Sequence, residues 1–352
     1  MNKLNTWTDS KFFEAVIGRP EIKMLSDENL QSHFKDSRIL IIGAGGSIGA
    51  ALSHRLEHAQ IPELFFLDHD ESALHNLALS LSNVSASQSH RYLLADIRDF
   101  CSIKNAIETV KPTIVVHAAA LKHLVMLERF PREGYLTNIE GTLNLAIACR
   151  ELKVNQLINI STDKAANPIS VLGMTKKIAE LITEEVFRDS NLLQCSVRFG
   201  NVFASRGSVI ETFVHQIYNS LPVTITSLEV SRFFMSHNEA ANLVLAAASL
   251  KESGTYIQNM GDEIKIIDVV NRIAKYAERS ATIKIIGLQK GEKIQEELFD
   301  GPTSPTQFDE ISLSIHELNP GLIREIQKNS PISHEEALIR IKKLMTHYIV
   351  KK

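Results

Sequence analysis

One short stretch of the sequence carries residue types that can move protons. Residues 160–180 read ISTDKAANPISVLGMTKKIAE, which indicates the end of a buried strand, a polar turn and then a helix. Asp163 and Lys164 lie in the turn, and Lys176 lies in the helix. A carboxyl group beside an amine can supply an acid and a base, and a lysine in a dry pocket near another cation loses its proton more easily. The plainer interpretation is a surface Asp–Lys pair that caps a helix.

A glycine-rich turn earlier in the chain predicts a nucleotide site. GAGGSIGA places Gly43, Gly46 and Gly49 between an apolar run and a helical pattern, where glycines let the backbone approach a pyrophosphate at a helix N-terminus. Asp68 ends the next apolar run, where a carboxylate binds ribose hydroxyls and repels a 2′-phosphate. NAD is therefore favoured over NADP. The alternatives are ordinary turn glycines and a surface aspartate.

The cofactor contacts that we predict follow four successive strands. They are Gly43, Gly46, Ser47, Ile48, Gly49, Asp68, Asp96, Ile97, Ala118 and Ala119. Asp96 is expected beside the adenine, and the small residues at 118 and 119 let the backbone pass close to a cofactor.

Strand and helix patterns alternate to position these residues. Apolar runs predict strands at 38–42, 63–68, 92–94, 113–117, 156–160 and 195–199, and helices are expected at 47–59, 138–151 and 334–348. Such alternation favours an α/β fold with a Rossmann-type doubly wound parallel sheet. We expect an N-terminal helical arm at 1–37, a dinucleotide-binding domain at 38–202 and a smaller C-terminal substrate-binding region at 203–352. About 236–265 is expected to return and pack on the dinucleotide-binding domain.

The N-terminal arm carries an apolar face. Trp7, Phe12, Phe13, Val16 and Ile17 are too apolar to be left in water together, so the arm should pack on the main body or on a second subunit. The arm is one reason to expect a homo-oligomer, at least a dimer, and the family resemblance described below is the other.

Composition narrows the classes of protein. The 352 residues carry a formal net charge of −3, which provides no basic field for nucleic acid. The 13 histidines are scattered, so no metal is expected. The three cysteines, Cys101, Cys149 and Cys195, lie in apolar stretches and are interpreted as reduced core residues. Since no targeting segment and no membrane-spanning stretch are visible, we expect a cytoplasmic protein.

Several segments resemble the nucleotide-sugar 4,6-dehydratases of bacterial polysaccharide biosynthesis, in the extended short-chain dehydrogenase/reductase superfamily. They are GAGGSIG, LDHDESAL, AAALKHL, NIEGTLNLA, STDKAANPISVLGMTKK and VRFGNVFASRGSVI. The resemblance covers most of the chain up to GLQKGEK and includes IGRP in the arm and SRFFMSHNEAANLVL. STDKA followed by TK is its most specific part. Many members act on UDP-N-acetylglucosamine, which implies a nucleotide-sugar substrate.

The resemblance implies internal redox chemistry with NAD. Oxidation of sugar C4 to a ketone acidifies the C5 hydrogen, a base removes that hydrogen, an acid helps the C6 hydroxyl leave as water, and hydride returns to C6. Asp163 matches the family's acid and Lys164 its base. Thr162 matches the threonine that hydrogen-bonds the sugar C4 oxygen, and Lys176 would hold the nicotinamide ribose.

Leu172 departs from the family pattern. Four residues before the helix lysine, short-chain dehydrogenases place a tyrosine that moves a proton. The soluble branch of the dehydratases keeps tyrosine there and inverts C5, whereas the larger membrane-anchored branch has methionine and retains C5. Leu172 resembles the methionine type, which implies activity with retention at C5. It leaves open which group takes the C4 hydroxyl proton.

Further positions match the family's substrate site. They are Lys122, His123, Asn201, Arg206, Arg232, Glu292 and Lys293. Arginines near a diphosphate suit bidentate contacts. Gln289 and Lys290 replace the family's usual arginine and proline, so the nucleotide (UDP or GDP) and the 2-substituent of the sugar stay open.

Two other functions remain open. A nucleotide-sugar 4-epimerase or ketoreductase would use the same cofactor, but simple redox needs no acid at O6, so the Asp163–Lys164 pair argues against it. A non-catalytic NAD-binding scaffold or sensor would explain Leu172 but not the presence of Asp163, Lys164 and Lys176.

Overall fold

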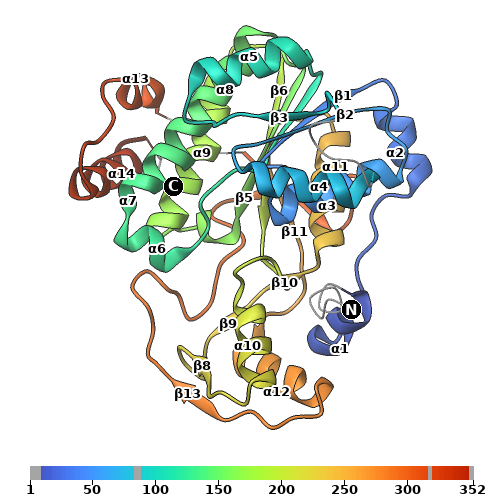
Figure 1. Ribbon diagram of the computed structural model, residues 1–352. Coiled ribbons are helices and arrows are strands. Elements are labelled where there is room, and N and C mark those ends of the chain that lie inside the picture. Colours follow the sequence, from blue (N-terminus) through green and yellow to red (C-terminus); the bar gives the residue numbers. More distant parts are fainter. Residues whose placement is uncertain (1–8, 83–88, 316–318, 349–352) are drawn as a thin grey trace.

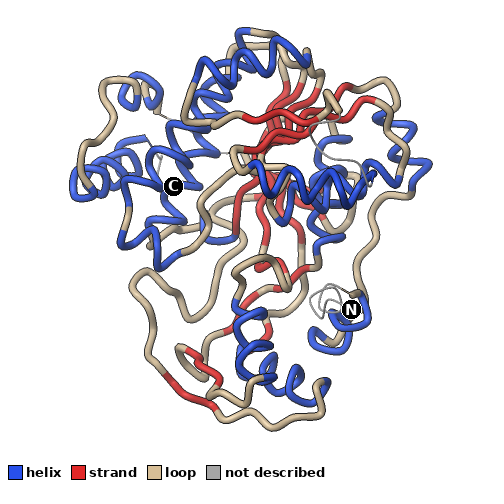
Figure 2. Tube along the Cα trace, in the orientation of Figure 1, coloured by secondary structure: helices blue, strands red, loops and turns tan. Residues whose placement is uncertain are grey.

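One mixed sheet forms the centre of the molecule. Its strands are β1 (Arg38–Ile42), β2 (Glu63–Asp68), β3 (Tyr92–Leu94), β4 (Ile114–His117), β5 (Gln156–Thr162), β6 (Leu193–Phe199), β11 (Gly254–Gln258), β14 (Thr303–Pro305) and β15 (Ile311–Ser314). The computed structural model describes residues 9–82, 89–315 and 319–348, and within them the strand order is β14-β15-β11-β6-β5-β4-β1-β2-β3 (Figures 1 and 2). From β3 across to β11 the pairs are parallel, and β15 and β14 add antiparallel pairs.

Alternate residues of the central strands enter two apolar layers. In β1, Ile39 and Ile41 belong to one buried cluster, and Leu40 and Ile42 belong to the other. This follows from the two-residue period of a strand in a sheet covered on both faces. The first layer lies under α2 (Asp27–Phe34), α3 (Ser47–His58), α4 (Glu71–Ser82) and α11 (His237–Ser249).

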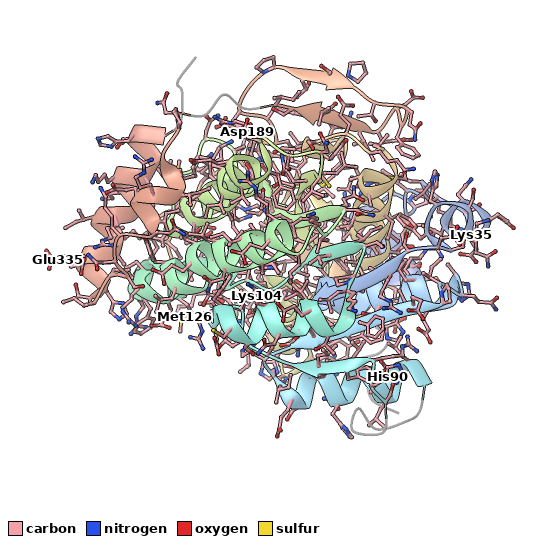
Figure 3. All side chains as sticks on the ribbon, turned by 90° about the horizontal axis from the view of Figure 1, so that it is seen from above. Lys35, His90, Lys104, Met126, Asp189 and Glu335 are labelled. Atoms are coloured by element: carbon pink, nitrogen blue, oxygen red, sulfur yellow. The ribbon has the colours of Figure 1, made fainter. Side chains whose placement is uncertain are left out.

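The second layer lies under helices from the middle and the end of the chain. They are α5 (Phe100–Val110), α6 (Leu124–Arg129), α7 (Pro131–Gly134), the π-helical η3 (Tyr135–Glu140), α8 (Gly141–Glu151), α9 (Val171–Phe187), α13 (Leu322–Ile326) and α14 (His334–Tyr348). Figure 3 looks down on this arrangement, with Lys104 of α5 and Met126 of α6 on the side of the second layer.

The predicted fold class is confirmed. Parallel strands β3-β2-β1-β4-β5-β6 are in the strand order of the dinucleotide-binding doubly wound fold, and the six predicted strands agree with the observed ones to within two residues at each end. One cysteine prediction is wrong. Cys149 and Cys195 are buried, but Cys101 is exposed, because it lies off the stripe that Ile103, Ile107 and Val110 turn toward the core.

A smaller lobe lies beyond the carboxyl edge of the sheet (Figure 1). It is formed by α10 (Val209–Tyr218), α12 (Ile266–Tyr276) and the paired short strands β8 (Val223–Ile225) with β13 (Ile283–Ile285) and β9 (Ser231–Arg232) with β12 (Ile264–Lys265). β7 (Asn201–Val202) pairs with β10 (Phe234–Met235) between the lobe and the sheet. α11 packs on α3, and β11, β14 and β15 belong to the main sheet. The domain boundaries predicted above stay a proposal.

The arm packs on the smaller lobe, as predicted for its apolar face. α1 (Ser10–Ile17) begins at Asp9, whose side chain accepts a hydrogen bond from the Lys11 amide at 3.1 Å, and it ends at Gly18 in a left-handed conformation. Phe12 and Phe13 are buried, with ring centroids 5.3 and 5.6 Å from the ring of Phe203. Val16 and Ile17 join the same cluster, whereas Trp7 lies outside the described residues.

Candidate functional site

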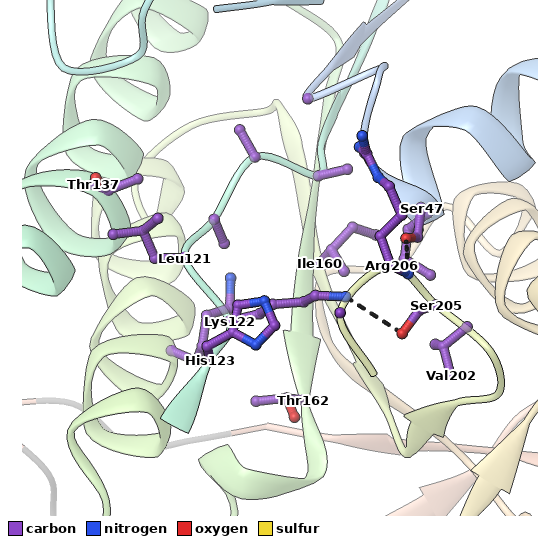
Figure 4. Close-up of a pocket in the computed structure, with 18 of the residues that line it drawn as sticks. Ser47, Leu121, Lys122, His123, Thr137, Ile160, Thr162, Val202, Ser205 and Arg206 are labelled. Carbon is purple, nitrogen blue, oxygen red and sulfur yellow. Dashed lines mark hydrogen bonds between the residues drawn. The ribbon is translucent and has the colours of Figure 1, made fainter. Parts of the chain in front are cut away.

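A cavity of about 940 Å³ opens at the carboxyl edge of the sheet. Its walls come from the segments that follow β1, β2, β3, β4 and β5, and from residues between 199 and 210 (Figure 4). The strand order reverses between β1 and β4, and doubly wound sheets bind ligands at such a switch point. The cavity is therefore the candidate active site.

The glycine turn has the geometry of a nucleotide cradle. Gly43 has a φ of 78°, and a Cβ on it would lie 2.5 Å from the backbone nitrogen of Ala119. A Cβ on Gly49 would lie 2.1 Å from the Gly43 oxygen, so glycine is required for α3 to approach the turn. Gly46 precedes α3 without a side-chain cap, and Gly46, Ser47 and Ile48 at this helix end line the cavity.

The other predicted cofactor residues surround the same space. All of them line the cavity except Gly49, which lies beneath the turn. The Asp68 carboxylate accepts hydrogen bonds from the amides of Gly45 at 2.9 Å and Asp70 at 3.1 Å, so it orders the glycine turn and also faces the cavity. Asp96 is paired with Arg98. A tight glycine turn, an open helix N-terminus and a carboxylate after β2 fit a dinucleotide.

The acid and base candidates form one hydrogen-bonded group at the end of β5. Asp163 Oδ1 accepts from Thr162 Oγ1 at 2.8 Å and from Lys164 Nζ at 3.0 Å. Lys164 Nζ also donates to Asn201 Oδ1 at 3.1 Å. Thr162 and Lys164 line the cavity, whereas Asp163 is fully buried behind them, and nothing in the described part of the chain donates to its Oδ2.

A glycine in α9 sets the position of this group. Ser170 caps α9 by accepting a hydrogen bond from the Gly173 amide at 3.0 Å. A Cβ on Gly173 would lie 2.1 Å from the backbone oxygen of Lys164, so only glycine lets the first turn of α9 approach the turn that carries Asp163 and Lys164. Gly173 was not among the predicted site residues, although a glycine in the first turn of a helix is itself a signal of close packing.

Lys176 and Leu172 face the cavity from α9. Leu172 is buried and offers no proton carrier where a tyrosine would stand. Burial lowers the pKa of Lys176 to about 8, against the smaller raising effect of Glu180. No described residue forms a hydrogen bond with the Lys176 ammonium, which therefore remains available to a ligand in the cavity.

The predicted substrate residues divide into two groups. Lys122, His123, Asn201 and Arg206 line the cavity. Figure 4 shows Lys122 Nζ beside Ser205 Oγ, at 3.3 Å, and the Arg206 amide beside Ser47 Oγ, at 3.1 Å. The Arg206 guanidinium also donates to the backbone oxygen of Gly45. Arg206 is thus nearer to the glycine turn than the sequence analysis expected for a substrate residue. Burial lowers the pKa of Lys122.

Arg232, Glu292 and Lys293 do not line this cavity. The buried Arg232 guanidinium donates to the backbone oxygens of Ser231, Lys293 and Ile294 and pairs with Glu292 at 3.2 Å. Its donors therefore hold the protein's own loop rather than a free phosphate.

That loop belongs to residues 286–302, an irregular segment between β13 and β14 that we call the strap. Lys293 Nζ donates to the Ala166 oxygen at 3.2 Å, and Asp300 accepts from Arg198 at 2.8 Å and from Lys177 at 2.6 Å. Between these anchors, Glu296 places Oε1 3.7 Å from Lys164 Nζ. Glu296 could not be predicted as part of the site, because no local pattern in the sequence connects it with residue 164.

No described helix has both the length and the apolar character needed to cross a membrane. Within residues 9–82, 89–315 and 319–348, no cluster of three or more potential metal ligands occurs.

Two curated relatives set the context for this site. The chain is 35% identical to the "Capsular polysaccharide biosynthesis protein CapD" of Staphylococcus aureus over 82% of its own length and 49% of the relative's. It is 34% identical to the "UDP-glucose 4-epimerase" of Rickettsia rickettsii, covering 75% of this chain and 78% of that one. The chain thus spans about half the length of CapD.

Solved structures share the fold. The structure of Pen from Bacillus thuringiensis is 33% identical, with a TM-score of 0.68 over 76% of this chain and 83% of that chain. The UDP-glucose 4-epimerase of Thermus thermophilus, solved in complex with NAD, is 20% identical, with a TM-score of 0.63 over 88% and 99% of the two chains. The family model described as "Polysaccharide biosynthesis protein" matches residues 39–315, well over half of the chain. On this evidence the chain belongs to the polysaccharide biosynthesis protein family.

Proposed function

We propose that this protein is an NAD-dependent nucleotide-sugar 4,6-dehydratase. Its substrate would be an NDP-N-acetylhexosamine, in the first instance UDP-N-acetylglucosamine, and its product the 4-keto-6-deoxy sugar. The observation that carries the proposal is that Thr162 and Lys164 line a cavity that fits a dinucleotide and are both hydrogen-bonded to Asp163 directly behind them. Removal of water needs an acid and a base side by side, and simple hydride transfer does not.

The cofactor site is formed by residues that the fold brings to one edge. The glycine turn at Gly43 and Gly46 would hold the pyrophosphate, Asp68 the adenosine ribose and Lys176 the nicotinamide ribose. NAD, when bound, supplies the acceptor and donor for the hydride that moves from sugar C4 to C6. The NAD complex of the Thermus thermophilus epimerase, which shares the fold, supports this assignment.

Thr162 offers a route for the C4 hydroxyl proton in the absence of a tyrosine. Its hydroxyl donates to Asp163 Oδ1 at 2.8 Å and lines the cavity, so it can accept a hydrogen bond from the sugar C4 hydroxyl. As C4 is oxidised, the C4 proton passes to Thr162 Oγ1 while the Thr162 proton passes to Asp163 Oδ1. Oxidation thus loads Asp163 with the proton that the C6 hydroxyl needs in order to leave as water.

Lys164 completes the elimination as the base at C5. Its free amine takes the C5 proton, which the C4 ketone has acidified. Asp163, which is buried behind Thr162, gives its proton back to Thr162 Oγ1 while Thr162 gives its own proton to the departing C6 hydroxyl. After C6 is reduced, Lys164 returns a proton to C5 from the same side, which predicts retention. Each group ends the cycle in its starting protonation state, so the proton balance closes.

The 4-epimerase remains a second candidate function. The relative from Rickettsia rickettsii bears that name at 34% identity. An epimerase needs neither an acid at O6 nor a base at C5. That reaction would therefore give Asp163 and Lys164 no catalytic role. A non-catalytic NAD-binding scaffold would use the cofactor part of the cavity but would likewise give no role to Asp163 and Lys164.

Mass spectrometry of the product tests these functions. The purified protein is incubated with NAD and a panel of UDP- and GDP-hexosamines. We expect loss of water from one of them, and in heavy water one deuterium at C5 with retained configuration. A product of unchanged mass would identify an epimerase, and turnover of none of the sugars would contradict the dehydratase.

Two variants sharpen the experiment. Thr162→Val removes the hydroxyl but preserves the shape of the side chain, so oxidation at C4 should slow by orders of magnitude, whereas Leu172→Met should be nearly neutral because it preserves volume and adds no proton carrier. Equal activity of the Thr162→Val variant and the wild type would refute the relay.

A further inference from the structure

A second carboxylate faces the Lys164 ammonium from the strap. Glu296 Oε1 lies 3.7 Å from Lys164 Nζ, and its side chain is only 3% exposed. It reaches this position because the strap is fastened on both sides of it. Arg232 holds the backbone oxygens of Lys293 and Ile294, and Arg198 holds the Asp300 carboxylate. The Glu296 amide donates to Glu263 Oε1 at 3.1 Å.

The proton balance of the proposed reaction requires such a group. Asp163 must start as a carboxylate, because it receives the C4 proton through Thr162. Lys164 must start as a free amine, because it removes the C5 proton. Asp163 therefore cannot also hold the proton that Lys164 gives up, although it is the nearest carboxylate, and Leu172 has no group that could accept a proton.

We propose that Glu296 is a positioning residue that accepts this proton from Lys164. Lys164 is thereby left as the neutral amine that can act as the base. One N–H bond of the Lys164 ammonium breaks and one O–H bond forms on the Glu296 carboxylate, which leaves a neutral amine beside a neutral acid. The transfer changes no net charge in the cluster and needs no other reactant. The inference rests on the proposed dehydratase function.

The surroundings of Glu296 favour this exchange. Burial raises the pKa of Glu296 and the Asp163 charge raises it further, against the lowering effects of Lys164, Arg232 and Lys293. Glu263 is the neighbouring carboxylate, and its two oxygens accept from the Glu296 amide and, at 2.6 Å, from Ser231 Oγ. With Asp163 and Glu296 both ionised, two buried carboxylates would lie beside the same ammonium, and a proton on Glu296 relieves the repulsion between them.

The pH dependence of kcat tests the proposal. In the wild type, the proton moves within the cluster, so kcat should stay level across the neutral range. Glu296→Gln keeps the shape but cannot take the proton, which must then leave to solvent. The variant should show a single ionisation, with kcat rising about tenfold per pH unit. Glu296→Asp, which restores a carboxylate, should restore the level profile at a lower rate. Glu297→Gln, on the exposed neighbour, is the matched control and should behave as wild type.

A second measurement does not depend on the reaction. Reductive methylation with formaldehyde labels only the free amine, and peptide mass spectrometry reads labelling at Lys164 alone. The extent of Lys164 labelling should be independent of pH in the wild type and should increase with pH in the Glu296→Gln variant. Parallel wild-type and Glu296→Gln profiles, in kcat or in labelling, would overturn the role of Glu296. If the wild type removes no water but the labelling profiles differ as stated, the dehydratase fails and the pairing of Glu296 with Lys164 stands.

Discussion

Replacing Lys176 with methionine should stabilise the cofactor-free protein while weakening its hold on NAD. The Lys176 ammonium is buried, and no described residue forms a hydrogen bond with it. Burial lowers the pKa of Lys176 from 10.5 to about 8. Methionine has a similar length and no charge, so it fills the same space without the desolvation penalty.

The size of the effect follows from the linkage between proton binding and stability. Each unit of pKa corresponds to about 1.4 kcal/mol, so the lowered pKa of Lys176 represents a penalty of about 3 kcal/mol. The penalty is fully present below about pH 8, where folded and unfolded chains both carry the charge. It disappears as the pH rises from about 8 to about 10.5, because the folded protein releases this proton first.

Urea unfolding followed by circular dichroism, without NAD, measures the gain. Lys176→Met should raise the free energy of unfolding by about 3 kcal/mol near pH 7 and by roughly half of that near pH 9. Lys177→Met is the matched control, because the buried Lys177 ammonium pairs with Asp300 at 2.6 Å and its loss should destabilise. A destabilised Lys176→Met variant, or a gain that does not change with pH, would refute the reasoning.

Four further predictions concern the site and the arm. Asp68→Ala should weaken NAD binding and reduce the preference for NAD over NADP, because the amide of Gly45 in the glycine turn loses its hydrogen-bond acceptor. Calorimetric titration with each cofactor measures both effects. Gly173→Ala should lower kcat at least tenfold with unchanged circular dichroism, since its Cβ would displace the Lys164 oxygen. Lys164→Ala should stop the reaction at the 4-ketone without loss of water, as mass spectrometry would detect. Phe13→Ala should cost about 3 kcal/mol of stability in urea unfolding, because its ring is buried.

The parallel sheet could be predicted because its signals are local. The runs of apolar residues, the glycines at 43, 46 and 49, and Asp68 after the second strand each occupy a few consecutive positions. The parallel order then follows from the handedness of strand–helix–strand crossovers. For the same reason Asp163 and Lys164 were recognised together, since one turn after one strand carries both, and the family resemblance added Thr162 at the end of that strand.

The packing of the C-terminal part of the chain against the main sheet was harder to predict in full. About 236–265 was expected to pack on the dinucleotide-binding domain, but β14, β15, α13 and α14 also lie on the main sheet and its helices. Edge strands and short covering helices have weak patterns, because partners elsewhere in the chain provide most of their burial.

The sequence by itself determined which elements form and which residues stand at the ends of the strands, because periodicity, turn chemistry and glycine spacing act over a few residues. Only the tertiary structure decided which distant groups meet. It turned the Arg232 guanidinium to the strap rather than to the cavity and brought Glu296 to within 3.7 Å of Lys164 Nζ. The physical reason is that such contacts depend on the path of the whole chain. Burial and charge act through space, so a local pattern in the sequence cannot identify which distant residue contacts a buried side chain.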